Sequence, residues 1–410
     1  LVYIILALTF GYTLIMAETS LGRMTRKSPV GAFESFGNSR FISIGGWINA
    51  TIPILIVPYY SVIGGWVIKY LIEYFAGHSK TLAGDAYFTT FISNGWSTEI
   101  CFIIFTLFTL GIIYAGVRNG IERVSKFMMP ILIVLSLIIA VYSVTRPGAI
   151  EGVKYFLVPN FDHFSWMTVV SAMGQMFYSL SIAMGILITF GSYMKKDTSI
   201  EKSTENVEIF DTAIAIMAGL MIIPAVFAFS GGNAETLKSG PALMFITIPK
   251  VFANMGFGTA IGVVFFLLVL FAAVTSSIAL TESAVSTFED ELHWSRKKST
   301  VFMGMVMLLL GTLSCLGYGP LANFKILGMQ FLDFFDFITN SVMMPIAAIA
   351  TCLLVSKVVG VDKIEEEIKK DGQAFRRKKI FCFMIKYLCP LFAAIILISS
   401  VANAFGIITM

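Results

Sequence analysis

Long apolar stretches, each about 20 to 30 residues, divide this sequence and are separated by short charged segments. An α-helix rises about 1.5 Å per residue, so about 20 apolar residues can cross a hydrocarbon core of about 30 Å. Only 13% of the 410 residues are charged, whereas an average soluble domain has about 25%. These features predict an all-α polytopic membrane protein. They exclude a soluble enzyme, a nucleic-acid-binding protein and a secreted disulfide scaffold.

Apolar windows along the chain predict ten membrane spans. Their approximate ranges are 1–22, 43–75, 99–117, 126–146, 166–194, 208–230, 257–288, 301–318, 328–357 and 380–408. Several of these ranges are longer than a bilayer requires, so we expect those helices to tilt or bend.

Lysine and arginine are distributed unequally among the connections between these spans. The connections after the first, third, fifth, seventh and ninth spans hold 22 of the 29 basic residues. Because cytoplasmic loops carry an excess of lysine and arginine, these connections are predicted to be cytoplasmic. Both ends of this chain are then extracytoplasmic. The chain begins at Leu1 inside an apolar stretch without a basic flank, so we expect an earlier segment, most simply one more span, rather than a signal peptide.

Two connections differ from the others in composition. The stretch 231–256 contains Gly240–Pro241 and Pro249, which are expected to interrupt a helix, so it is predicted to form an extracellular lid loop. The segment 358–379 is highly charged and is predicted to be a cytoplasmic connection. A solvated chain explains its composition, and an amphipathic helix is the alternative.

Several polar side chains fall inside the predicted spans, where an ionisable group is costly and tends to face a cavity or another polar group. The acids in or near spans are Glu18, Asp211, Asp333 and Asp336. Hydroxyl groups gather in the fifth and seventh spans, at 175–181 and 275–277. Serine and threonine can also bond back to helical carbonyls or allow close packing. Their joint occurrence with the acids favours an ion or solute pathway, and the Ser179–Ser181 region is the best candidate for a break in a helix.

Eight motifs follow one another along nearly the whole chain. They are ETSLGR (18–23), IPILIVPYYSVIGGW (52–66), GIERVSKFMMP (120–130), GQMFYSLSIAMG (174–185), DTAIAIMAGLMIIPAVFAF (211–229), GPALMFITIP (240–249), TSSIAL (275–280) and FEDEL (288–292). This series resembles the neurotransmitter:sodium symporter family, in its bacterial amino-acid-transporting branch.

The resemblance implies a fold, a location and an activity. The fold is a single transmembrane domain over residues 1–410, built as an inverted repeat of five-helix halves with sodium and substrate held centrally between broken helices. The first span matches the family's second helix, so ten of an expected eleven spans are present. The implied activity is sodium-coupled symport of an amino acid by alternating access in the bacterial inner membrane. No covalent chemistry and no organic cofactor are implied.

Residues for the substrate are carried over from the matching motifs. The hydroxyl of Tyr60 matches the group that bonds the substrate carboxylate, although aromatic packing beside Tyr59 would explain the same residue. The other positions that match the substrate pocket are Ile56, Tyr178, Ser179, Ser181, Met184, Ser276 and Leu280. They are largely apolar, so we expect a hydrophobic or aromatic amino acid, while core packing would account for the same residue types.

The resemblance also implies two sodium sites. Ser179 and Asp211 match side-chain ligands of the first site. The carbonyl of Ala272 and the hydroxyls of Thr275 and Ser276 match the second, and their spacing places all three on one helical face.

Further positions match gates and structural supports. Asp336 matches the acid of the outer gate, and Asp290 matches the acid of the inner gate, with Tyr193 near it. Glu18 matches an acid that accepts hydrogen bonds from amides freed at the break in the fifth span. A carboxylate at the membrane edge near Arg23 is the alternative explanation.

One departure from the family pattern concerns chloride. Tyr3, Gln175 and Ser179 match three positions that bind the anion in chloride-dependent members, but the fourth position is Ala215. Asp211 lies one helical turn earlier and can place a fixed negative charge near the same point, where it would balance the charge of sodium. The sequence therefore predicts chloride-independent transport and leaves proton exchange on Asp211 open for the return step.

The expected partners are an amino-acid substrate and membrane lipid, with a homodimer left open and no nucleic acid. Three alternatives remain at this point. The chain could be a truncated or inactive fragment of such a transporter, or an ion channel. A membrane enzyme is the third, and His163 beside Asp162 is its only hint.

Overall fold

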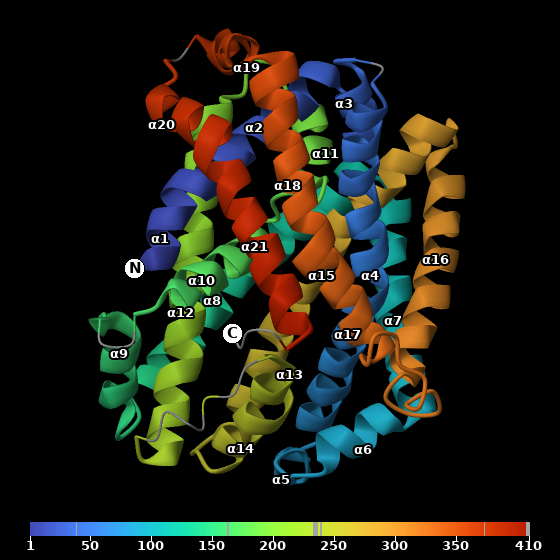
Figure 1. Cartoon of the computed structure of the whole chain (residues 1–410). Coiled ribbons are helices and arrows are strands. Elements are labelled where there is room, and N and C mark those ends of the chain that lie inside the picture. Colours follow the sequence, from blue (N-terminus) through green and yellow to red (C-terminus); the bar gives the residue numbers. More distant parts are fainter. Residues whose placement is uncertain (38, 162–163, 233–236, 238–239, 373, 407–410) are drawn as a thin grey trace.

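Membrane-length helices dominate the computed structural model, which describes residues 1–37, 39–161, 164–232, 237, 240–372 and 374–406. Nine helices of this described part are long and apolar enough to cross a membrane, and they stand together in one bundle (Figure 1). Their bounds are Val2–Thr25, Arg40–Phe75, Gly95–Tyr114, Val117–Val144, Ile200–Ser230, Gly258–Leu292, Arg296–Leu316, Phe331–Val359 and Lys378–Ala404. They correspond to nine of the ten predicted spans.

Four of these spans consist of several consecutive helical segments, and the other five are single helices. The first comprises α1 (Val2–Leu6), a π-helical turn and α2 (Tyr12–Thr25); the second, fifth, sixth and seventh are α4, α12, α15 and α16. The third is α7, and the fourth ends in α8 (Arg123–Val144). The eighth runs from α17 (Phe331–Asp336) through α18 (Met344–Leu353) to η7 (Leu354–Val359), and the ninth from α20 (Lys378–Phe383) to α21 (Cys389–Ala404).

The remaining predicted span, 166–194, is not one helix. It forms α10 (Trp166–Ser179) and α11 (Ile186–Tyr193), and residues 180–185 between them are not helical. The break therefore begins directly after Ser179, in the region where the hydroxyl-rich sequence predicts it.

Unusual backbone angles mark this break. Ser181 and Ala183 have φ of 53° and 58°, in the left-handed region that residues with a side chain rarely adopt. Gly185 has φ of 71°, and a Cβ there would lie 2.7 Å from Cγ of Pro29 and 2.9 Å from the carbonyl oxygen of Asn49. Glycine is required at position 185 both by the angle and by the close approach of α4.

Span ends differ from the hydropathy prediction where polar residues continue a helix. α12 begins at Ile200 rather than near residue 208, and the side chain of Ser199 caps it by accepting from the amide of Lys202 at 3.3 Å. Hydropathy marks the apolar core of a helix, whereas capping groups decide where the helix begins.

The predicted lid at 231–256 is partly helical. Residues 233–236 and 238–239 of this stretch lie outside the described part of the chain, but Gly240–Ala253 forms one short apolar helix through α13, η5 and α14. The expectation that Pro249 interrupts this stretch is wrong, because the helix continues from η5 (Leu243–Thr247) through Pro249 in α14 (Ile248–Ala253). The helix packs on α4, since the hydroxyl of Tyr70 donates to the carbonyl of Phe245 at 2.8 Å.

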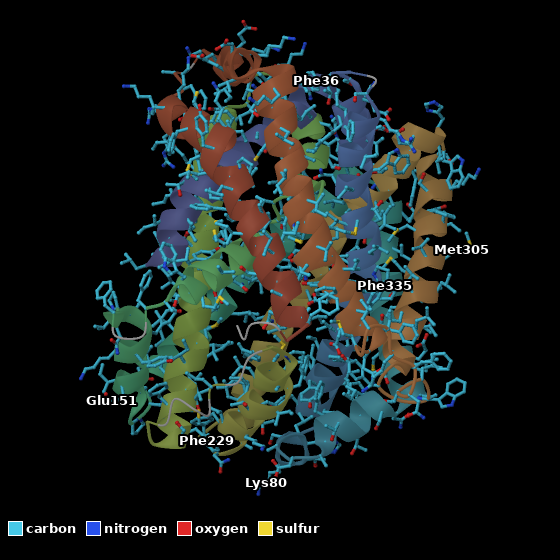
Figure 2. The ribbon with its side chains drawn as sticks, in the orientation of Figure 1. Phe36, Lys80, Glu151, Phe229, Met305 and Phe335 are labelled. Carbon is cyan, nitrogen blue, oxygen red and sulfur yellow. The ribbon has the colours of Figure 1, made fainter. Side chains whose placement is uncertain are left out.

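The charged segment 358–379 is folded against the bundle. α19 (Val361–Ile368) buries Val361, Ile364 and Ile368, and the Arg23 Nε atom of α2 lies 2.7 Å from Oε1 of Glu367. Burial opposes ionisation of Glu367, but Lys370 and Arg23 outweigh it and hold the pKa of this carboxyl below its ordinary value. The first part of the segment is thus an amphipathic helix that packs on the bundle, and the segment is not a wholly solvated connection. Phe36, close to α3 (Pro29–Glu34), and Lys80 in α5 (Ser79–Leu82) lie at opposite ends of the bundle (Figure 2).

α2 and α11 cross at two glycines. A Cβ on Gly22 would lie 2.0 Å from the carbonyl oxygen of Ile188, and a Cβ on Gly191 would lie 2.5 Å from the carbonyl oxygen of Thr19. Backbone atoms cannot give way as flexible side chains do, so this crossing depends on the absence of a side chain at both positions.

Substitution of Gly22 by alanine is therefore expected to destabilise the protein by about 1–3 kcal/mol, the usual cost of overpacking. The measurement is the thermal unfolding midpoint of purified protein in detergent. Gly111→Ala on α7 is the matched control, because a Cβ there meets nothing within 4 Å. An equal effect of both substitutions would contradict the close crossing of α2 and α11.

Candidate functional site

A cavity of about 380 Å³ lies beside the break between α10 and α11. Its volume is within the range of about 300–1,000 Å³ typical of ligand pockets. Its lining comes from α4, α8, the broken span and α15: Ile56, Tyr60, Met129, Tyr178, Ser179, Ser181, Met184, Ile186, Thr275, Ser276, Ala279 and Leu280. All eight residues that the sequence predicts for the substrate pocket line this one cavity.

Local helical spacing explains how the sequence delivers these side chains. Ile56 and Tyr60 are four residues apart on α4, and Ser276 and Leu280 are four apart on α15, so each pair shares one helical face. Ile56 and Leu280 are buried, and the hydroxyl of Tyr60 is within hydrogen-bonding reach of Ser276. Met129, Ile186 and Ala279 also line the cavity but are not predicted from the sequence, because apolar residues without a polar neighbour carry no local signal of a pocket.

Asp211 of α12 joins the broken span to α1. Its Oδ1 accepts from the hydroxyl of Ser179 at 2.7 Å, and its Oδ2 accepts from the hydroxyl of Tyr3 at 2.6 Å. A second cavity, of about 290 Å³, lies beside these groups, and its lining includes Tyr3, Gln175, Ser179 and Ala215. Ser179 therefore lines both cavities. The carboxylate occupies the neighbourhood of the three polar residues that match the anion site, as the spacing of Asp211 and Ala215 predicts.

The three residues predicted for the second sodium site lie on one face of α15. The hydroxyl of Thr275 donates to the carbonyls of Ala272 and Phe271 at 3.0 and 3.1 Å. Because its proton is engaged by the helix, the oxygen of Thr275 keeps its lone pairs for another partner. Thr275 and Ser276 both border the larger cavity, whereas Ala272 lies one turn away from it.

Glu18 of α2 reaches the broken segment. Its side chain is fully buried, and Oε1 accepts from the backbone amide of Ala183 at 2.8 Å. This amide has no helical acceptor, because Ala183 lies in the break. The structure thus brings Glu18 to the break in the fifth predicted span, where the resemblance implies a carboxylate.

Asp336 lies on the eighth span and contacts α4. Its Oδ1 accepts from the hydroxyl of Tyr59 at 3.1 Å and from the side-chain amide of Asn340 at 2.5 Å. Tyr59 directly precedes Tyr60 of the cavity, so Asp336 is tied to the helix that carries the predicted carboxylate-binding hydroxyl.

The two residues predicted for the inner gate have separate hydrogen-bond partners. Oδ2 of Asp290 accepts from the backbone amide of Ser28 at 2.5 Å, whereas the hydroxyl of Tyr193 donates to Oε1 of Glu282 at 2.7 Å. The hydrogen bond of Tyr193 is thus made with Glu282 rather than with Asp290. Hydrogen-bond partners between distant helices depend on side-chain direction, which resemblance of a single position does not determine.

Glu282, the acceptor of the Tyr193 hydroxyl, is not predicted from the sequence. Its side chain is fully buried, and two guanidinium nitrogens of Arg296 reach its carboxylate oxygens at 2.5 and 3.1 Å. An acid inside the predicted span 257–288, followed by an arginine at the start of the next helix, is the signal that could have revealed this pair.

Most of the chain is similar to known proteins. The profile of the Sodium:neurotransmitter symporter family matches residues 90–407. The uncharacterized sodium-dependent transporter YhdH of Bacillus subtilis (strain 168) is 31% identical over 412 residues, which cover 100% of this chain and 90% of that protein. An uncharacterized sodium-dependent transporter of Haemophilus influenzae is 29% identical over 98% of this chain and 89% of the relative. The crystal structure of MhsT in complex with L-phenylalanine matches with a TM-score of 0.86 and 32% identity, over 97% of this chain and 90% of that one.

A multi-pass helical membrane protein with a broken span and a central cavity is typical of a secondary transporter. The chain belongs to the sodium:neurotransmitter symporter family. The inverted-repeat transporter fold, coupling to sodium, symport of a small molecule and the absence of an enzymatic role are thereby confirmed. Asp162 and His163, on which the enzyme alternative depended, lie outside the described residues.

The buried pair of Glu282 and Arg296 generates a stability prediction. Arg296→Met leaves the buried carboxylate unpaired and is expected to cost about 3–5 kcal/mol, whereas the double change Glu282→Met and Arg296→Met is expected to recover most of this loss. Thermal unfolding of the purified variants in detergent measures both effects. A double variant as unstable as Arg296→Met alone would contradict the pairing.

Proposed function

We propose that the protein transports a hydrophobic or aromatic amino acid together with sodium, and that the 380 Å³ cavity beside the broken span binds the substrate. The observation that carries this proposal is the composition of the lining. Its described residues include no charged side chain; they combine apolar groups such as Ile56, Met184 and Leu280 with hydroxyl groups. Such a surface favours an apolar substrate side chain, since a charged one would lose its hydration without a compensating partner.

The backbone groups of an amino acid need polar partners in this cavity. The hydroxyl of Tyr60 is proposed to bond the substrate carboxylate, and the hydroxyls of Ser181 and Ser276 are further polar groups of the lining. The similarity to MhsT, whose crystal structure contains L-phenylalanine, supports an aromatic or hydrophobic substrate.

Two groups of oxygen atoms beside the cavity are proposed to bind sodium, a hard cation that prefers oxygen ligands. Ser179 and Asp211 would hold the first ion and Ala272, Thr275 and Ser276 the second. Ser179 borders the cavity and bonds Asp211, so occupation of the first site would act directly on the substrate site.

The proposed mechanism is alternating access, with Asp336 at the outer gate and Asp290 at the inner gate. With the basic face cytoplasmic, Asp336 would help to close the outer side after binding, and release of Asp290 would open the inner side. Each sodium charge that crosses contributes about 2.3 kcal/mol per 100 mV of membrane potential.

Uptake by protein reconstituted in liposomes tests this function. Sodium-dependent uptake of a radiolabelled mixture of amino acids is expected to be competed by phenylalanine or leucine and unaffected by aspartate or lysine. Tyr60→Phe is expected to raise the KM by about tenfold or more, because it removes a hydrogen bond to a charged group.

Tyr387→Phe is the matched control, since this side chain is 63% exposed on the outer surface of the bundle. Competition by charged rather than apolar amino acids would overturn the proposed substrate class. Folded protein without sodium-dependent binding or uptake would favour an inactive fragment.

We also propose that transport does not require chloride, because the carboxylate of Asp211 supplies the negative charge beside the first sodium site. Uptake by the wild-type protein is expected to be unchanged when gluconate replaces chloride. Asp211→Asn keeps the size of the side chain but removes the charge, and uptake in chloride-free medium is expected to fall at least about tenfold. A large loss of wild-type transport without chloride, restored by adding it, would overturn this proposal.

A further inference from the structure

An apolar groove of about 560 Å³ lies on the periphery of the bundle, at the end where α19 and α3 (Pro29–Glu34) are found (Figure 1). One wall is the beginning of α4, and the other is formed by α18 and η7. Of its fourteen lining residues, only Ser39 and Lys357 have polar side-chain atoms. None of the residues assigned to substrate, sodium or gates lines this groove.

Small residues shape the floor of the groove where α4 and α18 approach each other. A Cβ on Gly45 would lie 3.1 Å from Cβ of Ala350 and 2.9 Å from the ring of Phe33. Larger side chains rise on both sides, among them Phe41 and Leu353, which are 87% and 49% exposed. The result is a furrow between two helices rather than a flat apolar surface.

The length of the groove matches one leaflet of a bilayer. Its wall runs from Ile346 to Val358, thirteen residues that rise about 18 Å along a helix, and half of a hydrocarbon core is about 15 Å.

Positive charge gathers at one end of the groove. Lys357 lines this end, and Arg40 lies between the lining residues Ser39 and Phe41. Within the described residues neither cation forms an ion pair. Glu34, an acid of the neighbouring α3, is engaged by the hydroxyl of Ser43 at 2.7 Å.

We propose that this groove binds an anionic phospholipid of the adjacent leaflet, with one acyl chain in the furrow and the phosphate at Lys357 and Arg40. A chain of methylene groups fits an apolar furrow one leaflet deep, and a phosphate fits the unpaired Lys357 that lines its end, with Arg40 adjacent in sequence to the lining residues Ser39 and Phe41. Lysine and arginine near the membrane surface are the residues that attract anionic lipid. The proposal does not rest on the transport function, because it uses a separate surface of the molecule.

Native mass spectrometry of the purified protein, titrated with dioleoylphosphatidylglycerol or dioleoylphosphatidylcholine, tests the proposal. The wild-type protein is expected to retain one phosphatidylglycerol molecule in preference to phosphatidylcholine. Lys357→Gln is expected to weaken phosphatidylglycerol binding about fivefold, the effect of one basic residue at a membrane surface. Ile349→Trp fills the groove and is expected to abolish this one site for both lipids.

Two control variants make the same chemical changes elsewhere. Lys202→Gln removes an exposed lysine of α12 at the same end of the bundle, and Leu309→Trp enlarges a side chain of α16 that is 68% exposed. Both are expected to bind lipid like the wild-type protein, and circular dichroism checks that every variant is folded.

Three outcomes would overturn the proposal. The first is an equal loss of phosphatidylglycerol in Lys202→Gln and Lys357→Gln, which would indicate general surface charge. The second is displacement of the lipid by glycerol phosphate at equal concentration, which would leave the acyl chain without a role. The third is a change of oligomeric state in Ile349→Trp with unchanged lipid binding, which would indicate a second copy of the chain in the groove.

Discussion

Backbone amides and carbonyls inside a hydrocarbon core must find partners within the protein, and the architecture around the broken span depends on this requirement. Residues 180–185 leave the helical ladder, and Glu18 supplies an acceptor for the amide of Ala183 from a different helix. Tyr178, near the end of α10, and Ser181, inside the break, both line the cavity. A carboxylate on α2 therefore holds the broken segment that lines the cavity, although Glu18 does not line the cavity itself.

Charged side chains within the bundle connect elements that are distant in the sequence. Asp211 joins α12 to α10 and α1, Glu282 joins α15 to α16 through Arg296, and Arg23 joins α2 to α19 through Glu367. A buried ion pair contributes little net stability, but loss of one partner is costly. The main effect of these contacts is consequently to determine which helices pack together, and their contribution to the net stability of the bundle is small.

Hydropathy predicted the spans because it measures the free energy of transferring each segment out of water, which is a property of the segment alone. It did not predict that α12 would begin at Ile200 or that a helix would continue through Pro249, because capping and turn geometry decide those points. The resemblance predicted the lining of the cavity residue by residue, since the motifs preserve the spacing of side chains on each helix. Met129 and the Glu282–Arg296 pair escaped it, because their roles depend on neighbours in other helices.

The sequence by itself determined that the chain crosses a membrane, where most of its helices lie, and which side chains offer oxygen atoms inside the apolar spans. Only the tertiary structure decided which of these atoms meet. Tyr3 and Asp211 are 208 positions apart yet 2.6 Å from each other, and Tyr193 bonds Glu282 rather than Asp290. The reason is that apolar periodicity is a local property, whereas a contact between helices depends on their crossing, and close crossings here depend on glycines such as Gly22 and on the break that ends at Gly185.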